Sequence, residues 1–302
     1  MKRIAISIGD LNGVGIEIAL KAHKEIKKLC NPIYVINKHM LTQASELLNI
    51  DIPDDFELSF LDGDFEITPG KVSGKSGFYS YDSFMKGVKL CHDKECDAIV
   101  TLPIHKEAWE IGGVKFKGHT DVLRKYFKQD AIMMLGCEEM FVALFTEHIP
   151  LKDVAGKIQK DDLILFFINL LNDIGTDEKI AVLGLNPHAG DNGVLGDEEK
   201  EIAAAIEFIN SKLGKELLCG PLVPDVSFTP SSRKNFKYFV AMYHDQGLAP
   251  LKALHFDESI NVSLNLPIVR TSVDHGTAFD IAYQGKANTL SYINAIKSAI
   301  SL

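Results

Sequence analysis

Histidines follow the ends of four apolar, strand-like segments of the 302-residue sequence. The segments are "AIVTLPIH", "FVALFTEH", "IAVLGLNPH" and "YFVAMYH", and they end at His105, His148, His188 and His244. In open parallel α/β sheets, ligands bind beyond the carboxyl ends of the strands, so these side chains could meet at one edge. Imidazoles bind Zn, Co, Fe or Ni, and a three-histidine site leaves positions open for substrate oxygens. A single histidine at such a place is more often a hydrogen-bonded structural residue, so both interpretations stay open.

Two acidic residues lie close to these histidines or to similar strand ends. Asp245 directly follows His244, where it could orient that ring, join the coordination sphere of a metal or form a turn before Gly247. Asp225, in "PLVPDVSF", is ambiguous in the same way. The residue types alone do not separate these alternatives.

Positive charges that an anionic substrate would need follow in the same part of the chain. Lys252 comes eight residues after His244, and Arg270 lies in "PIVRTSVDHG". Arginine can hold a phosphate or carboxylate through two parallel hydrogen bonds, although most lysines and arginines are solvated surface charges. In "KGHTD", Thr120 precedes a helix-like stretch. It is either a simple N-cap or part of a helix N-terminus that receives an anion.

Strand-like and helix-like segments alternate along the chain, which predicts an α/β protein with mainly parallel strands. Strands are expected at residues 3–9, 32–37, 97–103, 140–146, 179–186, 237–243 and 260–272. Helices are expected at residues 16–29, 81–94, 120–127, 161–174 and 198–213. The Gly-rich segment 187–199 lies between a strand and a helix, which favours a functional loop. The sequence has no GxGxxG fingerprint and no P-loop, so a dinucleotide would need a different kind of site.

Length and charge narrow the class of protein. A chain of 302 residues is long for one hydrophobic core, which favours two domains. The net charge of −9 and the lack of a Lys/Arg block argue against nucleic-acid binding.

The cysteines and the apolar segments bear on the compartment of the protein. The five cysteines form no CxxC pair. The most apolar helix-like stretch, residues 163–174, is too short to span a bilayer. Since no signal-peptide pattern is present, we expect a cytoplasmic protein that does not use a membrane.

Several motifs, taken in order, resemble one enzyme family. They are the glycine-rich start, "GHTD", "TEHIPLKD", "GLNPHAGD", "MYHDQGLAPLK" and "INVSLNLPIVRTSVDHGTAFDIA". From about residue 5 onward, the chain is similar to the 4-hydroxythreonine-4-phosphate dehydrogenase family of pyridoxal 5′-phosphate biosynthesis. The resemblance implies an isocitrate/isopropylmalate dehydrogenase-like fold, with two α/β/α domains around a central cleft, and a homodimer whose chains share the active site. It places one domain at about residues 1–120 with 275–302, and the other, with the metal and the dimer interface, at 121–274.

The resemblance also implies roles for individual residues. One divalent metal (Zn, Co or Mg) would be bound by His148, His188 and His244, supplied by both chains, which makes His105 structural. The substrate, a small phosphorylated amino acid, would be contacted by His119, Thr120, Lys252, Asn261 and Arg270. The segment 274–288 resembles a loop that binds NAD or NADP. Its residues near the adenosine would be His275, Gly276, Thr277 and Asn288.

The implied reaction is the metal-dependent, NAD(P)-linked oxidation of 4-phosphooxy-L-threonine. The resulting β-keto acid would lose CO2 to give 3-amino-2-oxopropyl phosphate. The group that takes the hydroxyl proton would be Asp245, Asp225 or Lys252.

The N-terminal loop departs from the family pattern GDPAGIGPE, because Leu11 and Ile16 stand in place of prolines. This departure touches neither the metal positions nor the phosphate positions.

Other functions fit the same residues. A paralogous NAD-dependent dehydrogenase for a four-carbon phosphorylated sugar acid or a dihydrodiol would share the metal and the cofactor, and a substrate panel distinguishes it. A three-histidine metallohydrolase would not bind NAD(P). A metal-stabilised binding protein without turnover would not need the charges that follow the strands.

Overall fold

The computed structural model describes every residue from Met1 to Leu302. The chain forms two compact units, residues 1–131 together with 260–302, and residues 132–259. These limits differ from the boundaries expected near residues 120 and 274. The difference arises because the strands within residues 260–273 pair with each other and with a strand of the first unit.

The first unit contains a mainly parallel sheet with the strand order β3-β2-β1-β4-β11-β10. Its strands are β1 (Arg3–Ser7), β2 (Asn31–Val35), β3 (Leu58–Ser59), β4 (Ala98–Thr101), β10 (Ile260–Leu264) and β11 (Val269–Val273). All neighbours pair in parallel except β10 and β11, which form an antiparallel hairpin. The hairpin register places Ser263 opposite Arg270 and Asn261 opposite Ser272. Because side chains alternate along a strand, both polar pairs project from the same face of the sheet.

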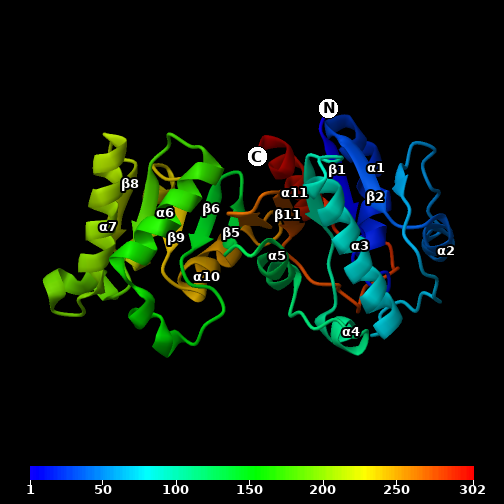
Figure 1. Cartoon of the computed structure of the whole chain (residues 1–302), viewed down its shortest axis with the longest axis horizontal. Coiled ribbons are helices and arrows are strands. Elements are labelled where there is room, and N and C mark those ends of the chain that lie inside the picture. The colour runs from blue at the N-terminus through cyan, green and yellow to red at the C-terminus, as the bar shows by residue number, and fades with distance from the viewer. The chain divides into compact units, whose positions relative to one another are not determined.

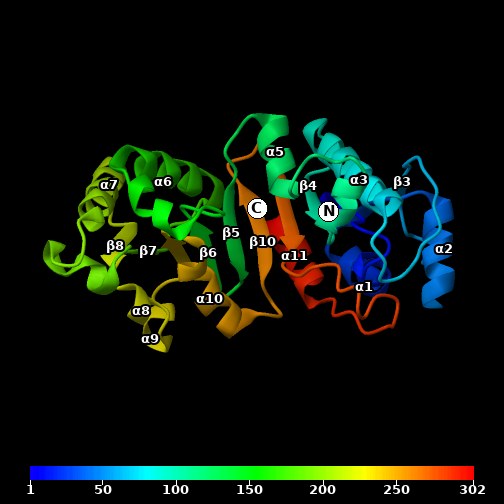
Figure 2. The ribbon, with the colours of Figure 1, turned by 90° about the horizontal axis from the view of Figure 1, so that it is seen from below.

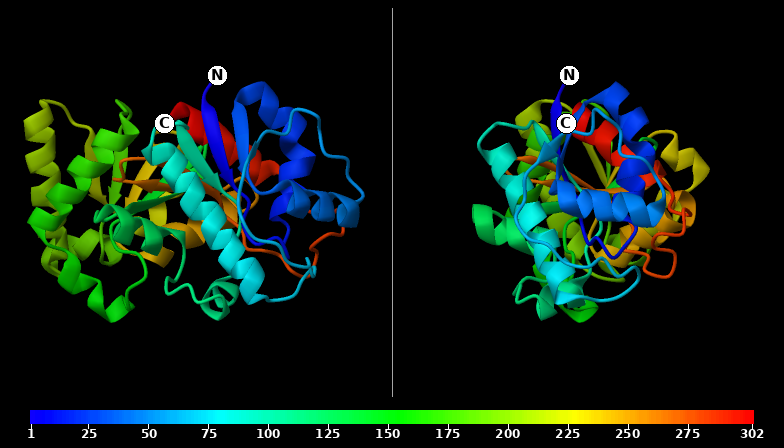
Figure 3. Two further views of the ribbon diagram at one scale, coloured as in Figure 1. Left: turned by 45° about the vertical axis from the view of Figure 1, so that its right-hand side comes forward. Right: turned by 90° about the vertical axis from the view of Figure 1, so that its right-hand side faces the viewer.

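Helices cover both faces of this sheet. α1 (Gly15–Leu29) and α11 (Leu290–Ser301) contact each other on one face, and α3 (Gly74–His92) lies on the other (Figures 1 and 2). In the left view of Figure 3, α3 crosses in front of β1 while α11 lies behind the strands. The remaining helices are α2 (Lys38–Leu48), α4 (Lys106–Ile111) and α5 (His119–Phe127). The unit is therefore an α/β/α sandwich.

The second unit has a sheet with the order β5-β6-β9-β7-β8. Its strands are β5 (Ile132–Cys137), β6 (Met140–Leu144), β7 (Ile180–Leu183), β8 (Leu218–Leu222) and β9 (Tyr238–Ala241). β5 and β6 form an antiparallel hairpin, and the other neighbours are parallel. α6 (Lys160–Ile174) and α7 (Glu198–Leu213) cover one face, and α10 (His244–His255) packs on β5, β6 and β9 on the other (Figure 2). The short helices are η1 (Leu151–Asp153), η2 (Ala155–Lys157), η3 (Pro187–Gly193), α8 (Pro224–Ser227) and α9 (Pro230–Arg233).

The α/β class predicted from the sequence is confirmed. Each expected strand overlaps an observed one, and the segment 260–272 overlaps two because residues 265–268 form the hairpin turn. Three strands, β3, β5 and β8, were not expected, nor were α2, α4, α8, α9, α10 and α11. No helix combines the length and the apolar character that crossing a membrane requires.

The glycine-rich loop before α1 packs tightly against the segment that follows β11. The backbone N–H of Val14 donates to the carbonyl oxygen of Thr277 at 3.0 Å. An added Cβ at Gly13 would lie 2.9 Å from the Cβ of Thr277, too close for any real side chain. Glycine is therefore required at this position by the close approach of two backbones.

A buried carboxylate fixes the same segment to α1 further along. Glu17 accepts hydrogen bonds from the backbone N–H groups of Ala287 at 2.9 Å and Gly285 at 3.3 Å. Its side chain is fully buried and pairs with the ammonium group of Lys21 at 3.3 Å. Lys21 also donates to the carbonyl oxygens of Gly285 and Ala287, both at 3.0 Å. These two charged residues hold a segment that has no helix or strand of its own.

Replacing Glu17 by alanine should lower the free energy of unfolding by about 2–4 kcal/mol, because buried N–H groups lose their acceptor and Lys21 loses its counterion. Urea denaturation followed by circular dichroism measures the change. Glu25→Ala is the control, since Glu25 is exposed on the same helix and its loss should change stability by no more than about 0.5 kcal/mol. Equal effects of the two substitutions would contradict the role given to Glu17.

Candidate active site

A guanidinium without an acidic partner lies inside the first unit. Arg270 of β11 is 3% exposed, and it donates to Ser263 Oγ at 3.0 Å and to Thr101 Oγ1 at 2.8 Å. It also contacts His119 Nδ1 at 3.2 Å, and its Nε has no partner. Burial lowers the pKa of Arg270 to about 9, so the group is charged at neutral pH but poorly solvated. A negatively charged ligand would compensate this charge.

The guanidinium determines the tautomer of His119, the first residue of α5. A guanidinium can only donate hydrogen bonds, so Nδ1 of His119 accepts and the ring proton resides on Nε2. Burial, and then the positive charge of Arg270, hold the pKa of His119 well below its usual range, which keeps the ring neutral. Nε2 is buried and has no partner within the chain. Arg270 and His119 therefore both present unpaired donors of the kind that binds an anion.

Two other predicted substrate contacts lie in the same unit. Asn261 of β10 has a buried Oδ1 without a hydrogen-bond partner, and it shares a sheet face with Ser263. Thr120 is the second residue of α5 and does not cap it, because extended backbone at Gly118 lets the helix begin one residue earlier. No side chain caps this helix, so the N–H groups of its first turn lack that partner.

Two of the predicted metal ligands lie next to each other in the second unit. The ring centroids of His148 and His244 are 5.4 Å apart. His148 follows β6, and its side chain is 68% exposed, with Nδ1 3.9 Å from a carboxylate oxygen of Glu147. His244 begins α10, and its Nδ1 forms a 2.7 Å hydrogen bond with Asp245 Oδ1. This contact holds the ring through Nδ1 and does not involve Nε2 of His244.

The third predicted ligand, His188, lies in η3 and is exposed. Residues 188–192 all have φ values in the left-handed region, a conformation that is costly for non-glycine residues and is concentrated at functional sites. Buried Glu199 supports this segment by accepting from the backbone N–H groups of Leu185 at 2.9 Å and Asn186 at 2.7 Å. Within one chain, the three histidines do not bring their ligand atoms within 4.8 Å of one another.

The remaining predicted residues of this unit have different surroundings. Asp225 is exposed in the first turn of α8, which contacts η3. The ammonium group of Lys252, in α10, lies 5.5 Å from the centre of the Phe256 ring. Asp225 therefore lies on a helix that contacts the segment of His188, and Lys252 lies on the helix that begins with His244.

His105, in the first unit, has a structural role. Its Nδ1 accepts from the backbone N–H of Ala108 at 3.4 Å and caps α4. The ring also stacks on Phe279, with centroids 4.7 Å apart. The exclusion of His105 from the ligand set stays a prediction.

The predicted cofactor residues divide into two kinds. His275 has a buried Nε2 without a partner, and an added Cβ at Gly276 would meet no neighbouring atom. Thr277 is buried against the N-terminal loop, and Asn288 is exposed and accepts from the N–H of Leu290 at 2.9 Å. His275 thus has an unpaired ring nitrogen, and Gly276 has open space beside its backbone.

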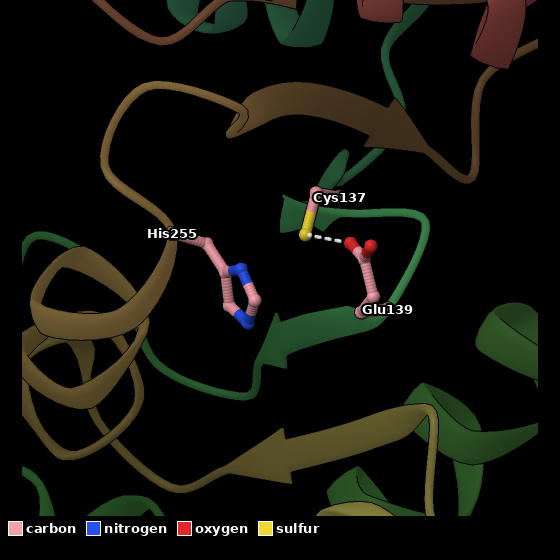
Figure 4. A group of neighbouring side chains, drawn as sticks. All are labelled: Cys137, Glu139 and His255. Atoms are coloured by element: carbon pink, nitrogen blue, oxygen red, sulfur yellow. Dashed lines mark hydrogen bonds between the residues drawn. The ribbon is translucent and has the colours of Figure 1, made fainter.

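One group of possible ligands was not anticipated from the sequence. Cys137, Glu139 and His255 bring a sulfur, a carboxylate oxygen and a ring nitrogen within 4.8 Å of one another (Figure 4).

The sequence also did not predict which residues bind Arg270, namely Thr101 and Ser263. The register of the β10–β11 hairpin would have identified Ser263, but the sequence does not show that register.

Known proteins resemble the chain over nearly its whole length. The model of the family described as "Pyridoxal phosphate biosynthetic protein PdxA" matches residues 28–299. The chain belongs to the PdxA family. The 4-hydroxythreonine-4-phosphate dehydrogenase of Sulfurimonas denitrificans is 67% identical over 300 residues, which cover 99% of this chain and 97% of that protein. The protein of the same name from Campylobacter fetus is 58% identical over 303 residues, covering 100% and 98%.

Solved structures agree with membership of the PdxA family. A crystal structure of the 4-hydroxythreonine-4-phosphate dehydrogenase from Klebsiella pneumoniae matches with a TM-score of 0.83 at 31% identity, covering 100% of this chain and 99% of that one. A β-decarboxylating dehydrogenase from Thermococcus kodakarensis matches with a TM-score of 0.55 at 12% identity, covering 100% and 82%. The second match shows the fold alone. The expected family and the isocitrate/isopropylmalate dehydrogenase-like fold are confirmed.

The neutral state of His119 should make the folded protein sensitive to mild acid. The unfolded chain binds a proton at this residue below about pH 6.5, whereas the folded chain does not, so stability falls as the pH falls below that value. The slope contributed is up to about 1.4 kcal/mol per pH unit. Urea unfolding between about pH 7 and pH 5 should therefore show a shallower loss for His119→Gln than for the natural chain.

His39→Gln is the matched control, because His39 is exposed on α2. This variant should keep the pH slope of the natural chain. If His119→Gln also keeps it, the ring of His119 is protonated in the folded state and the tautomer argument fails.

Proposed function

We propose that the chain oxidises 4-phosphooxy-L-threonine with NAD or NADP and a divalent metal, and that β-decarboxylation then gives 3-amino-2-oxopropyl phosphate and CO2. The observation that carries this proposal is the buried guanidinium of Arg270, whose partners are two hydroxyls and a neutral imidazole. Such a charge suits a phosphate or carboxylate of the substrate. The names of the relatives, 4-hydroxythreonine-4-phosphate dehydrogenases, support both the substrate and the oxidation.

The proposed metal site consists of His148, His188 and His244, shared between the two chains of a homodimer. The adjacency of the His148 and His244 rings and the contact of Asp245 with His244 support it. A set of imidazoles fits Zn or Co more readily than Mg. We propose that a second chain completes the set, since one chain does not assemble it.

The proposed nicotinamide cofactor lies along the segment 275–288, with His275 and Gly276 as its main contacts. The unpaired Nε2 of His275 and the open space at Gly276 support this assignment. Glu17 and Val14 would keep the segment in place when the cofactor binds and leaves. When bound, the metal supplies Lewis acidity at the hydroxyl and carbonyl oxygens, and the nicotinamide accepts the hydride.

The residues of the chain would bind and orient the substrate. Arg270 and the Nε2–H of His119 would hold one anionic group, and Lys252 would hold the other. Asn261 and the first turn of α5, at Thr120, offer further polar contacts. Because Asp245 already bonds to His244, we assign it an orienting role, which leaves Asp225 and Lys252 as candidates for taking the hydroxyl proton.

An assay of NAD(P) reduction with 4-phosphooxy-L-threonine tests the proposal directly. Absorbance of NADH or NADPH should rise only with a divalent metal present, and His188→Ala should lose metal and nearly all turnover while keeping its circular dichroism spectrum. His39→Ala, an exposed histidine on α2, is the control and should stay active. Full activity of His188→Ala, or of the natural chain in metal-depleted buffer, would refute the metal site.

A substrate panel separates the alternatives in the same assay. A higher kcat/KM with a four-carbon phosphorylated sugar acid or a dihydrodiol would identify a paralogous dehydrogenase. Turnover without NAD(P) would identify a hydrolase. Either result would replace the proposed reaction.

Arg270→Lys should lower kcat/KM for the phosphorylated substrate roughly 10- to 150-fold, which corresponds to about 1.5–3 kcal/mol for a lost charged hydrogen bond. The positive charge remains, but lysine cannot present the planar pair of donors. Steady-state kinetics with the same substrate measure the effect. Arg3→Lys is the control, because Arg3 forms only an exposed ion pair with Glu57 at 3.4 Å. Unchanged kcat/KM in Arg270→Lys would remove Arg270 from the substrate site.

A further inference from the structure

Three side chains of the second unit converge at a place that the proposed reaction does not use. Cys137 ends β5, Glu139 lies in the two-residue turn before β6, and His255 ends α10. Figure 4 shows the thiol and the carboxylate on the hairpin facing the imidazole from the helix. One ligand atom of each residue lies within 4.8 Å of those of the other two. This Cys137–Glu139–His255 cluster therefore joins a hairpin to a helix end.

The cluster contains donors that the protein leaves incompletely paired. The thiol of Cys137 is 3% exposed and donates to Glu139 Oε2 at 3.1 Å. The His255 side chain is 15% exposed, and its Nε2 is buried without any hydrogen-bond partner. Its Nδ1 lies 3.7 Å from Glu258 Oε2. His255 therefore has an unpaired ring nitrogen, and one of its ring nitrogens lies close to a thiol and a carboxylate, which together are ligand types that a transition metal binds.

We propose that Cys137, Glu139 and His255 bind a Zn²⁺-type transition-metal ion at a site separate from the three-histidine set. Sulfur, imidazole nitrogen and carboxylate oxygen are the three ligand types that Zn²⁺ takes in proteins. Thiolate selects against Mg²⁺ and Ca²⁺, and a thiolate with a carboxylate balances the two positive charges of the ion. Water or Glu258 can complete four-coordination, and Glu258 can otherwise orient the His255 ring.

The two metal sites occupy opposite ends of one helix. His244 is the first residue of α10 and His255 is the last, eleven residues later. At 1.5 Å of rise per residue, their backbones are about 16 Å apart, so one ion cannot serve both. An ion at the cluster would fasten the end of α10 to the β5–β6 hairpin, on which α10 already packs. We therefore assign it a structural role in holding the helix that carries His244 and Lys252.

Cobalt distinguishes this site from the other one, because thiolate bound to Co²⁺ gives an intense near-ultraviolet charge-transfer band that imidazole ligands do not give. The metal-free, reduced chain carrying His188→Ala, which lacks one proposed ligand of the three-histidine site, is titrated with Co²⁺. We expect the band to saturate at one equivalent per chain. Adding Cys137→Ser should abolish it. Cys219→Ser is the matched control, since Cys219 is a partly exposed thiol on β8, and it should keep the band.

Two further variants test the other ligands and guard against misfolding of Cys137→Ser. Glu139→Gln changes an exposed side chain, and His255→Asn removes the imidazole; each should weaken Co²⁺ binding at least about tenfold. In the same His188→Ala background, Zn²⁺ should raise the Tm of the chain and of its Cys219→Ser variant, but not of its Cys137→Ser variant.

Three results would overturn the proposal. In the His188→Ala background, they are no charge-transfer band, the same band after Cys137→Ser is added, and unchanged Co²⁺ affinity after Glu139→Gln and His255→Asn are added. The contact would then be only a hydrogen bond from a thiol to a carboxylate. These outcomes do not depend on dehydrogenase activity, so failure of this site and failure of the proposed reaction are separately visible.

Discussion

The burial of the Arg270 charge is the constraint on which the first unit depends. A guanidinium removed from water needs compensation, and here three elements each supply one neutral dipole: β4 through Thr101, β10 through Ser263 and α5 through His119. A carboxylate in their place would have neutralised the charge and closed the site to anions. Hydroxyls and a neutral imidazole instead stabilise the charge without cancelling it. The position of β11 between β4 and β10 is what makes this arrangement available.

The same constraint explains features that are otherwise unconnected. The antiparallel register of β10 and β11 places Ser263 opposite Arg270. The donor-only chemistry of the guanidinium then sets the tautomer of His119, and burial keeps that ring neutral. Asn261, two residues before Ser263, extends the same polar face with an unpaired oxygen. One buried charge on β11 thus orders polar groups from two strands and a helix.

The sequence predicted regular elements well where apolar runs were continuous, and poorly where breakers or very short elements occurred. β8 contains Gly220 and Pro221, β3 has two residues, and α10 contains Gly247 and Pro250, so none of them shows a clean period. For the same reason, His244 was expected at the end of a strand but begins a helix. The burial of Arg270 was not predictable, because it depends on the pairing of distant strands. Cys137 and His255 are separated by more than a hundred residues, and only the packing of α10 on the β5–β6 hairpin brings them together.

The helix α10 links the chemistry of the second unit to its stability. Its first residue, His244, is a proposed catalytic ligand, and Asp245 in the first turn is placed where the helix dipole favours a carboxylate, so the residue that orients the ring also stabilises the helix. A helix interrupted by Pro250 lacks one backbone hydrogen bond and needs support from packing. Leu248 and Leu251 supply that support within the core, and the Cys137–Glu139–His255 cluster would add a point of attachment at the far end. Because His244 and Lys252 can act only from a fixed helix, an ion that binds away from the reaction would still control how well the two side chains are held.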